Sequence, residues 1–197
     1  MSKPTPDVGA ILLTGGASRR MGFDKSGIEI DGLTLAVRTA SLLLRVVETA
    51  VEVGPGVSGL PVTLERPPGG GPLIAIDAGY RALRQRGREG AALVIACDLP
   101  FVSEELLRLL AEWDSPGSVV PVANGQPQPL LARWGQDDLE NIRSLIERGV
   151  RSLRHLAEQP TTTLLNESQW DVVAHEREFF DVDSPDDLRR LGVWNSD

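Results

Sequence analysis

Residues 12–26, with the sequence LLTGGASRRMGFDKS, combine two features that suit phosphate binding. Gly15 and Gly16 lack the β-carbon that keeps a backbone away from a ligand. Arg20 and Lys25 add a planar guanidinium fork and a compact ammonium charge, and both bind phosphate oxygens well. The whole chain carries a net charge of −8, so this positive segment is a local feature. We therefore predict that it contacts the phosphates of a nucleotide.

A carboxylate, Asp98, follows the most apolar run of the chain, AALVIA at 91–96. A strand buried on both faces would leave this side chain without partners unless it lies at the strand's open end. At that position it suits a Mg²⁺ ligand. The alternative is that Asp98 only initiates an Asp-Leu-Pro turn.

Strand-like and helix-like segments alternate along the chain, which predicts an α/β fold with a mostly parallel sheet covered on both faces. Ligands bind such sheets at the carboxyl ends of the strands, where residues 14–25 and Asp98 are expected. We predict one domain over 1–197, with a flexible tail at 1–7. The predicted strands are 8–13, 49–53, 60–65, 91–96, 118–122 and 129–134, and the predicted helices are 33–47, 73–87, 103–113, 137–149 and 184–192.

Composition excludes several classes of function. An acidic chain is a poor general nucleic-acid binder, because such binders need a basic surface. No apolar run approaches the length that spans a bilayer, so we expect no membrane association. The N-terminus lacks the apolar core of a signal peptide, and Cys97 is the only cysteine, so we expect a cytoplasmic protein.

Two familiar nucleotide motifs do not fit. A Walker A loop needs adjacent glycine, lysine and serine or threonine, whereas Phe23 and Asp24 separate Gly22 from Lys25. The segment GPGVSG at 54–59 matches the dinucleotide fingerprint in its glycines, but LPVTLE follows it instead of a helix. We interpret that segment as a glycine-rich loop.

Five motifs together resemble those of the molybdenum cofactor guanylyltransferase family. The most specific is LTGGASRRMGFDK at 13–25. The others, in the family's order, are GGPLIAI at 70–76, ACDLP at 96–100, QPQPLLARW at 126–134 and FFDVDSPDDL at 179–188. The resemblance implies a Rossmann-like three-layer α/β/α sandwich with a mostly parallel, partly mixed sheet, which would form a single nucleotidyltransferase domain.

The resemblance also implies a reaction, in which GMP passes from GTP to molybdopterin, or its molybdenum-loaded form, and pyrophosphate leaves. It allows transient contacts with proteins that deliver molybdopterin and with recipient molybdoenzymes. Carried over residue by residue, the implied catalytic residues are Arg20, Lys25 and Asp98, the nucleotide contacts are Leu13, Thr14, Gly15, Gly16, Lys25, Glu65 and Asp98, the Mg²⁺ ligands are Asp98 and Asp183, and the pterin contacts are Gln128, Pro129 and Leu130.

The chain departs from the family pattern at three positions that bear on nucleotide or metal binding. Gly54 stands near a family asparagine that helps to bind the nucleotide, Glu65 replaces an aspartate, and Asp183 replaces an asparagine. A carboxylate at Glu65 can accept hydrogen bonds from guanine N1–H and N2–H₂ together. The alternatives are a molybdopterin cytidylyltransferase or another small-molecule nucleotidyltransferase, and a non-catalytic nucleotide-binding adaptor. Cytidylyl relatives tend to carry L-A-A-G where this chain has LTGG, which favours guanine.

Overall fold

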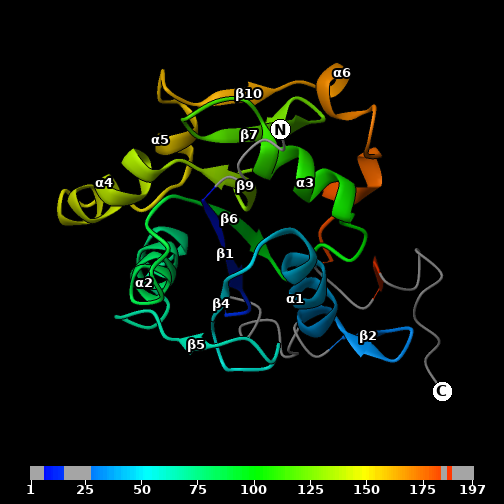
Figure 1. Ribbon diagram of the computed structural model, residues 1–197, viewed down its shortest axis with the longest axis horizontal. Coiled ribbons are helices and arrows are strands. Elements are labelled where there is room, and N and C mark those ends of the chain that lie inside the picture. Colours follow the sequence, from blue (N-terminus) through cyan, green and yellow to red (C-terminus); the bar gives the residue numbers. More distant parts are fainter. Residues whose placement is uncertain (1–6, 16–27, 183–185, 188–197) are drawn as a thin grey trace, which may run out of the picture.

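The central feature of the computed structural model is a sheet of eight strands (Figure 1). The structure describes residues 7–15, 28–182 and 186–187. The strand order is β10-β7-β9-β6-β1-β4-β5, with β8 paired to β7. The strands are β1 (Val8–Leu13), β4 (Ala50–Val53), β5 (Val62–Thr63), β6 (Ala91–Ala96), β7 (Val119–Ala123), β8 (Gln126–Pro127), β9 (Leu131–Trp134) and β10 (Thr163–Leu165), while β2 (Glu29–Ile30) and β3 (Leu33–Thr34) form a separate ribbon.

Most neighbouring strands run parallel, and β9 is the exception within the main order. It pairs antiparallel with both β6 and β7. Strand β1 pairs parallel with β4 on one side and with β6 on the other. The chain therefore passes from β1 to β4 on one side of β1, and later adds β6 on the other side of β1. This reversal of strand order is where α/β proteins form ligand-binding crevices.

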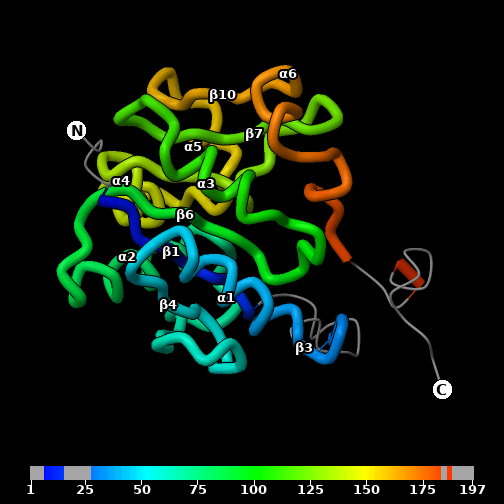
Figure 2. Tube along the Cα trace, turned by 45° about the vertical axis from the view of Figure 1, so that its right-hand side comes forward, coloured from blue at the N-terminus to red at the C-terminus, as the bar shows by residue number. Residues whose placement is uncertain are grey.

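Helices cover both faces of the sheet (Figures 1 and 2). The first pair, α1 (Leu35–Val46) and α3 (Glu104–Glu112), packs together on one face. The second pair, α2 (Pro72–Arg84) and α4 (Gln136–Glu147), packs together on the other. The short helices are α5 (Arg154–Ala157), α6 (Glu167–Trp170) and the 3₁₀ helix η3 (Glu176–Phe179). The predicted α/β/α sandwich with a mostly parallel, partly mixed sheet is confirmed.

Local sequence explains where the long helices begin. The Thr34 hydroxyl accepts a hydrogen bond from the Val37 amide at 3.3 Å, and the Ser103 hydroxyl accepts from the Leu106 amide at 3.2 Å. Each cap satisfies a backbone N–H that has no partner within the helix. Helix α2 instead begins with Pro72, whose missing N–H costs nothing at this position.

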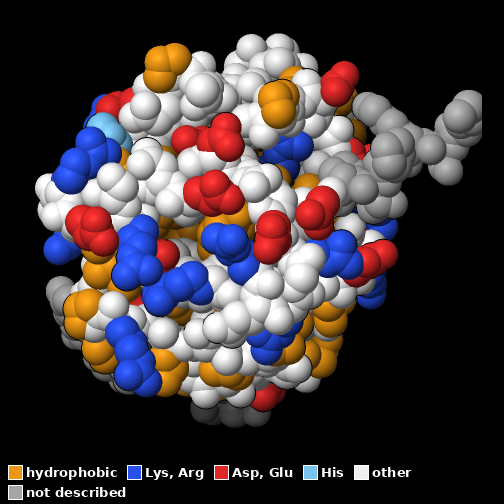
Figure 3. Space-filling model, turned by 60° about the vertical axis from the view of Figure 1, so that its left-hand side comes forward, with side chains coloured by type: hydrophobic (Ala, Val, Ile, Leu, Met, Phe, Trp, Pro, Cys, Tyr) orange, Lys and Arg blue, Asp and Glu red, His pale blue; other side chains and the backbone are white. Residues whose placement is uncertain are grey.

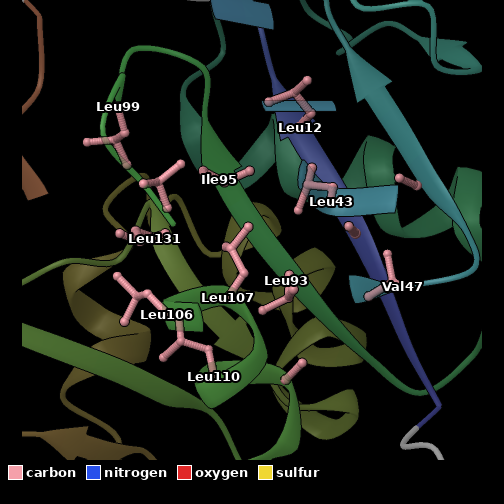
Figure 4. Packing of buried hydrophobic residues seen from close by; sticks show 14 of the residues in the cluster. Leu12, Leu43, Val47, Leu93, Ile95, Leu99, Leu106, Leu107, Leu110 and Leu131 are labelled. Atoms are coloured by element: carbon pink, nitrogen blue, oxygen red, sulfur yellow. The ribbon is translucent and has the colours of Figure 1, made fainter. Parts of the chain in front are cut away.

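Two apolar cores lie on the two faces of the sheet. Every residue of β1 is buried, and its side chains alternate between the two cores. Leu12 packs with residues of α1 and α3, whereas Ile11 packs with residues of α2 and α4. Figure 4 shows the first core, in which Leu43 from α1 and Leu107 from α3 lie over Leu12, Leu93 and Ile95. A strand buried on both faces explains the uninterrupted apolar pattern of VGAILL.

The observed elements follow the predicted ones with local differences. Strand β5 is shorter than the predicted 60–65, and the sequence analysis did not predict β2, β3, β8 or β10. Of the predicted helix 184–192, only residues 186–187 are described. Asp7, the last residue of the predicted tail, pairs with Arg88 at 3.4 Å. None of the helices in the described part of the chain is long and apolar enough to cross a bilayer.

A close approach between α2 and the sheet yields the first testable prediction. A β-carbon at Gly79 would lie 2.5 Å from Ile11 Cγ2 and 3.0 Å from Val53 Cγ2. In an exposed helix, glycine to alanine stabilises by about 1 kcal/mol. Here Gly79→Ala should instead lower the free energy of unfolding by about 1–3 kcal/mol, because the core must shift to admit the methyl group. Urea denaturation measures this difference.

Ser144→Ala on the exposed face of α4 is the control for that measurement. It should change the free energy of unfolding by no more than about 0.5 kcal/mol. Stabilisation of the protein by Gly79→Ala would contradict the close packing of α2 on β1.

Candidate nucleotide site

Three parallel strands end together at one edge of the sheet. Leu13 is in register with Val53 of β4 and with Ala96 of β6. The residues that follow, Thr14 and Gly15 after β1 and Asp98 after β6, therefore lie at the same edge. The sequence predicts this convergence, which follows from the parallel pairing of the strands.

The backbone of Thr14 and Gly15 is held on both sides. Both amides donate to the carbonyl of Val53, at 3.2 and 3.3 Å. On the other side, the Leu13 carbonyl accepts from the Cys97 amide at 3.1 Å. These bonds fix the path of the chain as it leaves β1, before it enters the glycine-rich segment.

Glu65 belongs to the same edge, two residues beyond β5. The Gly54 amide donates to the Thr63 carbonyl at 3.2 Å, so the ends of β4 and β5 are joined. The half-buried Glu65 carboxylate accepts a hydrogen bond from the Gly69 amide at 2.8 Å, which closes the loop leading to α2. One carboxylate oxygen of Glu65 therefore has a structural partner.

Asp98 is half-buried beyond the end of β6. Its carbonyl accepts from the Val182 amide at 2.9 Å, which joins this edge to the segment before Asp183. Among the described residues, no three His, Cys, Asp or Glu side chains gather as a metal cluster. Mg²⁺ commonly binds through one or two protein carboxylates together with water and substrate phosphates, so Asp98 fits such a ligand.

The predicted pterin contacts also reach this edge, because β9 runs antiparallel to β6. Residues 128–130 precede β9, and the Leu130 carbonyl accepts from the Ala96 amide at 2.9 Å. The Gln128 side-chain amide donates to the Gln126 carbonyl at 3.2 Å, within its own hairpin. Gln128, Pro129 and Leu130 are each half-buried.

The remaining predicted site residues, Gly16, Arg20, Lys25 and Asp183, lie outside the described residues. The predicted contacts of the diglycine turn and of the two cations with phosphates therefore stay predictions, as does the second Mg²⁺ ligand.

The sequence analysis missed Glu52, the most unusual residue at this edge. It lies in β4 with none of its surface exposed to solvent. Its carboxylate accepts hydrogen bonds from Thr14, Gly56, Val57 and Ser58. The available signal was a single acidic residue in an otherwise apolar strand, followed directly by the glycine-rich loop GPGVSG. That loop leads to β5 and not to a helix, so it lacks the context of a dinucleotide fingerprint.

A surface groove elsewhere contains none of the predicted site residues. It has a volume of about 340 Å³ and lies between α2 and α4, on the face shown in Figure 3. Arg81, Arg84 and Arg143 line it together with Asp77 and Glu140. Arg81 pairs with Asp77 at 2.8 Å, so part of the positive charge is already balanced. The strand ends remain the better candidate for a nucleotide site.

The reversal of strand order and the glycines at the strand ends are features that nucleotide-binding α/β proteins share. Comparison with known proteins identifies the family within this class. Residues 10–163 match the MobA-like NTP transferase domain, which is most of the chain, so the protein belongs to this family. It is a nucleotidyltransferase.

Individual relatives agree with this assignment. A protein of Pelotomaculum thermopropionicum named "Probable molybdenum cofactor guanylyltransferase" is 30% identical over 194 residues, covering 93% of this chain and 91% of that protein. A protein of the same name from Mycobacterium tuberculosis is 31% identical over 170 residues, covering 80% and 84%. The crystal structure of molybdopterin-guanine dinucleotide biosynthesis protein A from Archaeoglobus fulgidus superposes with a TM-score of 0.71 at 25% identity, covering 92% of this chain and 95% of that one.

The ionised state of Glu52 yields a prediction on pH. Burial alone raises the pKa of this carboxyl, but hydrogen bonds from Ser58, Thr14 and the Val57 amide outweigh burial and bring the pKa below its ordinary value of 4.5. A carboxyl with a lowered folded pKa stabilises the protein above its unfolded pKa, and this stabilisation is lost as the pH falls through the folded pKa. The free energy of unfolding should therefore decrease as the pH falls below about 4.5.

Urea denaturation of the unmodified protein and of Glu52→Gln, from pH 7 downward, measures this contribution. The variant should be less stable at pH 7 and should show a weaker loss of stability in the acid range. Equal acid dependence in the two proteins would contradict the ionised, hydrogen-bonded state of Glu52.

Proposed function

We propose that this nucleotidyltransferase transfers GMP from GTP to molybdopterin, with or without its molybdenum, and releases pyrophosphate. The observation that supports this most directly is the convergence at one sheet edge of Leu13, Thr14 and Gly15, Glu65, Asp98 and residues 128–130. These are the positions to which the resemblance of the motifs assigns the nucleotide and pterin contacts. The names of the relatives supply the acceptor substrate and the base.

The proposed reaction needs a nucleophile and a leaving group, and the substrates supply both. An oxygen of the terminal phosphate of molybdopterin attacks the α-phosphorus of GTP and forms a new P–O bond. The bond from the α-phosphorus to the oxygen bridging the β-phosphorus breaks, and its electron pair leaves with pyrophosphate. The nucleophilic phosphate is already ionised, so the protein mainly aligns the two substrates and stabilises charge.

This chain's residues divide that work. The backbone at Leu13, Thr14 and Gly15 holds the nucleoside, and Arg20 and Lys25 bind the triphosphate. Arginine contacts two phosphate oxygens with its planar fork, while lysine is a compact charge suited to the oxygen on which negative charge develops. Residues 128–130 position the pterin on the far side of β6, where the antiparallel β9 begins.

Asp98 would hold Mg²⁺, with Asp183 as a second ligand. When bound, the metal neutralises charge on the phosphate oxygens and on the departing pyrophosphate. The role of Asp98 is to place one carboxylate at the strand end where those phosphates lie.

Two substitutions test the assignment of the site. Lys25→Ala and Asp98→Asn should each lower pyrophosphate release from GTP and molybdopterin by at least about 10²-fold, because each removes charge stabilisation from the transferred group. Steady-state kinetics measure this loss, and circular dichroism checks that the variants stay folded. Asp171→Asn, on an exposed residue after α6, is the matched control and should keep full activity. Near-normal turnover in either site variant would contradict the assignment.

Parallel assays with GTP, CTP and ATP test the base. GTP should be used best, and Glu65→Ala should reduce the ratio of kcat/KM for GTP to that for CTP by about 10-fold, since a lost hydrogen bond to a charged group costs about 1.5 kcal/mol. Glu89→Ala, on the exposed residue two positions before β6, is the control and should keep the ratio. Preferential use of CTP would overturn the guanine assignment in favour of a cytidylyltransferase. Unchanged selectivity in Glu65→Ala would mean that another group reads the base.

A further inference from the structure

The buried carboxylate of Glu52 needs a role that the proposed reaction does not supply. A fully buried charge is costly unless hydrogen bonds replace its hydration. Glu52 meets this requirement with donors to both oxygens. An apolar residue in β4 would avoid the cost altogether, as the other buried residues of that strand do. The carboxylate therefore serves the groups that it binds.

Those groups come from two different parts of the chain. Oε1 accepts from the Thr14 hydroxyl at 2.5 Å and from the Gly56 and Val57 amides at 2.7 and 3.1 Å. Oε2 accepts from the Ser58 amide at 2.9 Å and the Ser58 hydroxyl at 2.5 Å. One carboxylate thus joins the end of β1 to the loop that follows β4.

The join is tight at Gly54. A β-carbon at this position would overlap the Thr14 hydroxyl oxygen and would lie 2.8 Å from the Gly15 amide nitrogen. The Thr14 side chain therefore occupies the space that the β-carbon of any other residue at position 54 would need. Glu52 holds the Thr14 hydroxyl in that space.

We propose that Glu52 is a positioning residue for nucleotide binding, which acts through Thr14. It fixes the Thr14 side chain against Gly54 and so holds the backbone of Thr14 and Gly15 in the path that the nucleotide contacts. Position 54 thereby presents backbone of fixed shape and no side chain. The inference rests on the proposed function, in which that backbone binds the nucleoside.

A purely stabilising role of Glu52 would affect nucleotide affinity differently from a positioning role. If Glu52 only stabilises the loop at 54–59, its loss lowers stability but leaves nucleotide affinity unchanged in the folded protein. If it positions Thr14, the dissociation constant and KM rise while kcat at saturating nucleotide changes little, because bound substrate still meets the same reacting groups.

The test measures dissociation constants of the full chain by isothermal titration calorimetry. GTP, CTP and ATP are titrated in the presence of Mg²⁺, at a temperature where every variant is folded. Thr14→Val removes the hydroxyl and keeps the shape, and it should raise the dissociation constant of the tightest-binding nucleotide by about 10-fold. Glu52→Gln should raise the dissociation constant by at least as much. Thr14→Ser keeps the hydroxyl, so it should recover the affinity that Thr14→Val loses. The double variant Glu52→Gln/Thr14→Val should bind nucleotide no more weakly than Glu52→Gln alone, because the two residues act as one unit.

Arg133→Gln is the matched control. Arg133 is also a buried charge that organises a loop, since its guanidinium donates to the carbonyls of Ala111, Trp113, Ser115 and Gly117. It lies in β9 opposite Leu93, away from the strand ends of the site. Its substitution should lower stability without changing the dissociation constant.

Different results would overturn the role of Glu52 and the proposed function. Unchanged affinity in folded Glu52→Gln and Thr14→Val, or an equal loss in Arg133→Gln, would overturn the role of Glu52 while leaving the function intact. If CTP binds most tightly, the guanine assignment fails, and the same ratios measured with CTP decide the role of Glu52. If none of the three nucleotides binds the unmodified chain, the proposed function and the inference both fail.

Discussion

Parallel pairing of β4, β1 and β6 is the constraint on which the site depends. Parallel neighbours end at a common edge, so residues far apart in sequence meet there without any long-range recognition of their own. The Val53 carbonyl accepts from both Thr14 and Gly15, and the Leu13 carbonyl accepts from Cys97, so the strand ends are tied to one another. The helices on the two faces then have one main task, which is to cover a sheet that is apolar on both sides.

Two buried charges complement this arrangement. Glu52 gathers hydroxyl and amide donors at the carboxyl edge, and Arg133 gathers backbone carbonyls from the segment after α3. Glu52 accepts on both carboxylate oxygens and Arg133 donates from two guanidinium nitrogens, so each charge binds several groups of one loop at once. These single ions add to the apolar packing of Leu60 and Trp113, which anchor the same two segments on the first core.

The sequence predicted the fold and the edge well, because both depend on local signals. Apolar runs located β1 and β6, a capping serine located α3, and strand direction placed Asp98 at the same edge as Thr14. The sequence did not predict the bond between Glu52 and Thr14, because it joins residues 38 positions apart and each has ordinary alternatives locally. The sequence did not predict strand β10 for a related reason. Its three residues pair with β7 at one end of the described sheet, and so short a segment has no clear periodicity. Gly54 seemed to be a missing contact, whereas the structure shows why no side chain fits there.

The antiparallel strand β9 lies between the parallel strands β6, β1 and β4 and the hairpin of β7 and β8. Residues 128–130 reach the edge through the hairpin of β7 and β8, which turns at Asn124 and Gly125 with the positive φ angles of a tight two-residue connection. A hairpin tip can lengthen or change sequence without shifting the register of β4, β1 and β6. In the proposed function, residues 128–130 can therefore vary with the acceptor while the strand ends proposed to bind the nucleotide keep their register. Under that proposal, a change of acceptor needs a new hairpin sequence but no change in the pairing of β4, β1 and β6.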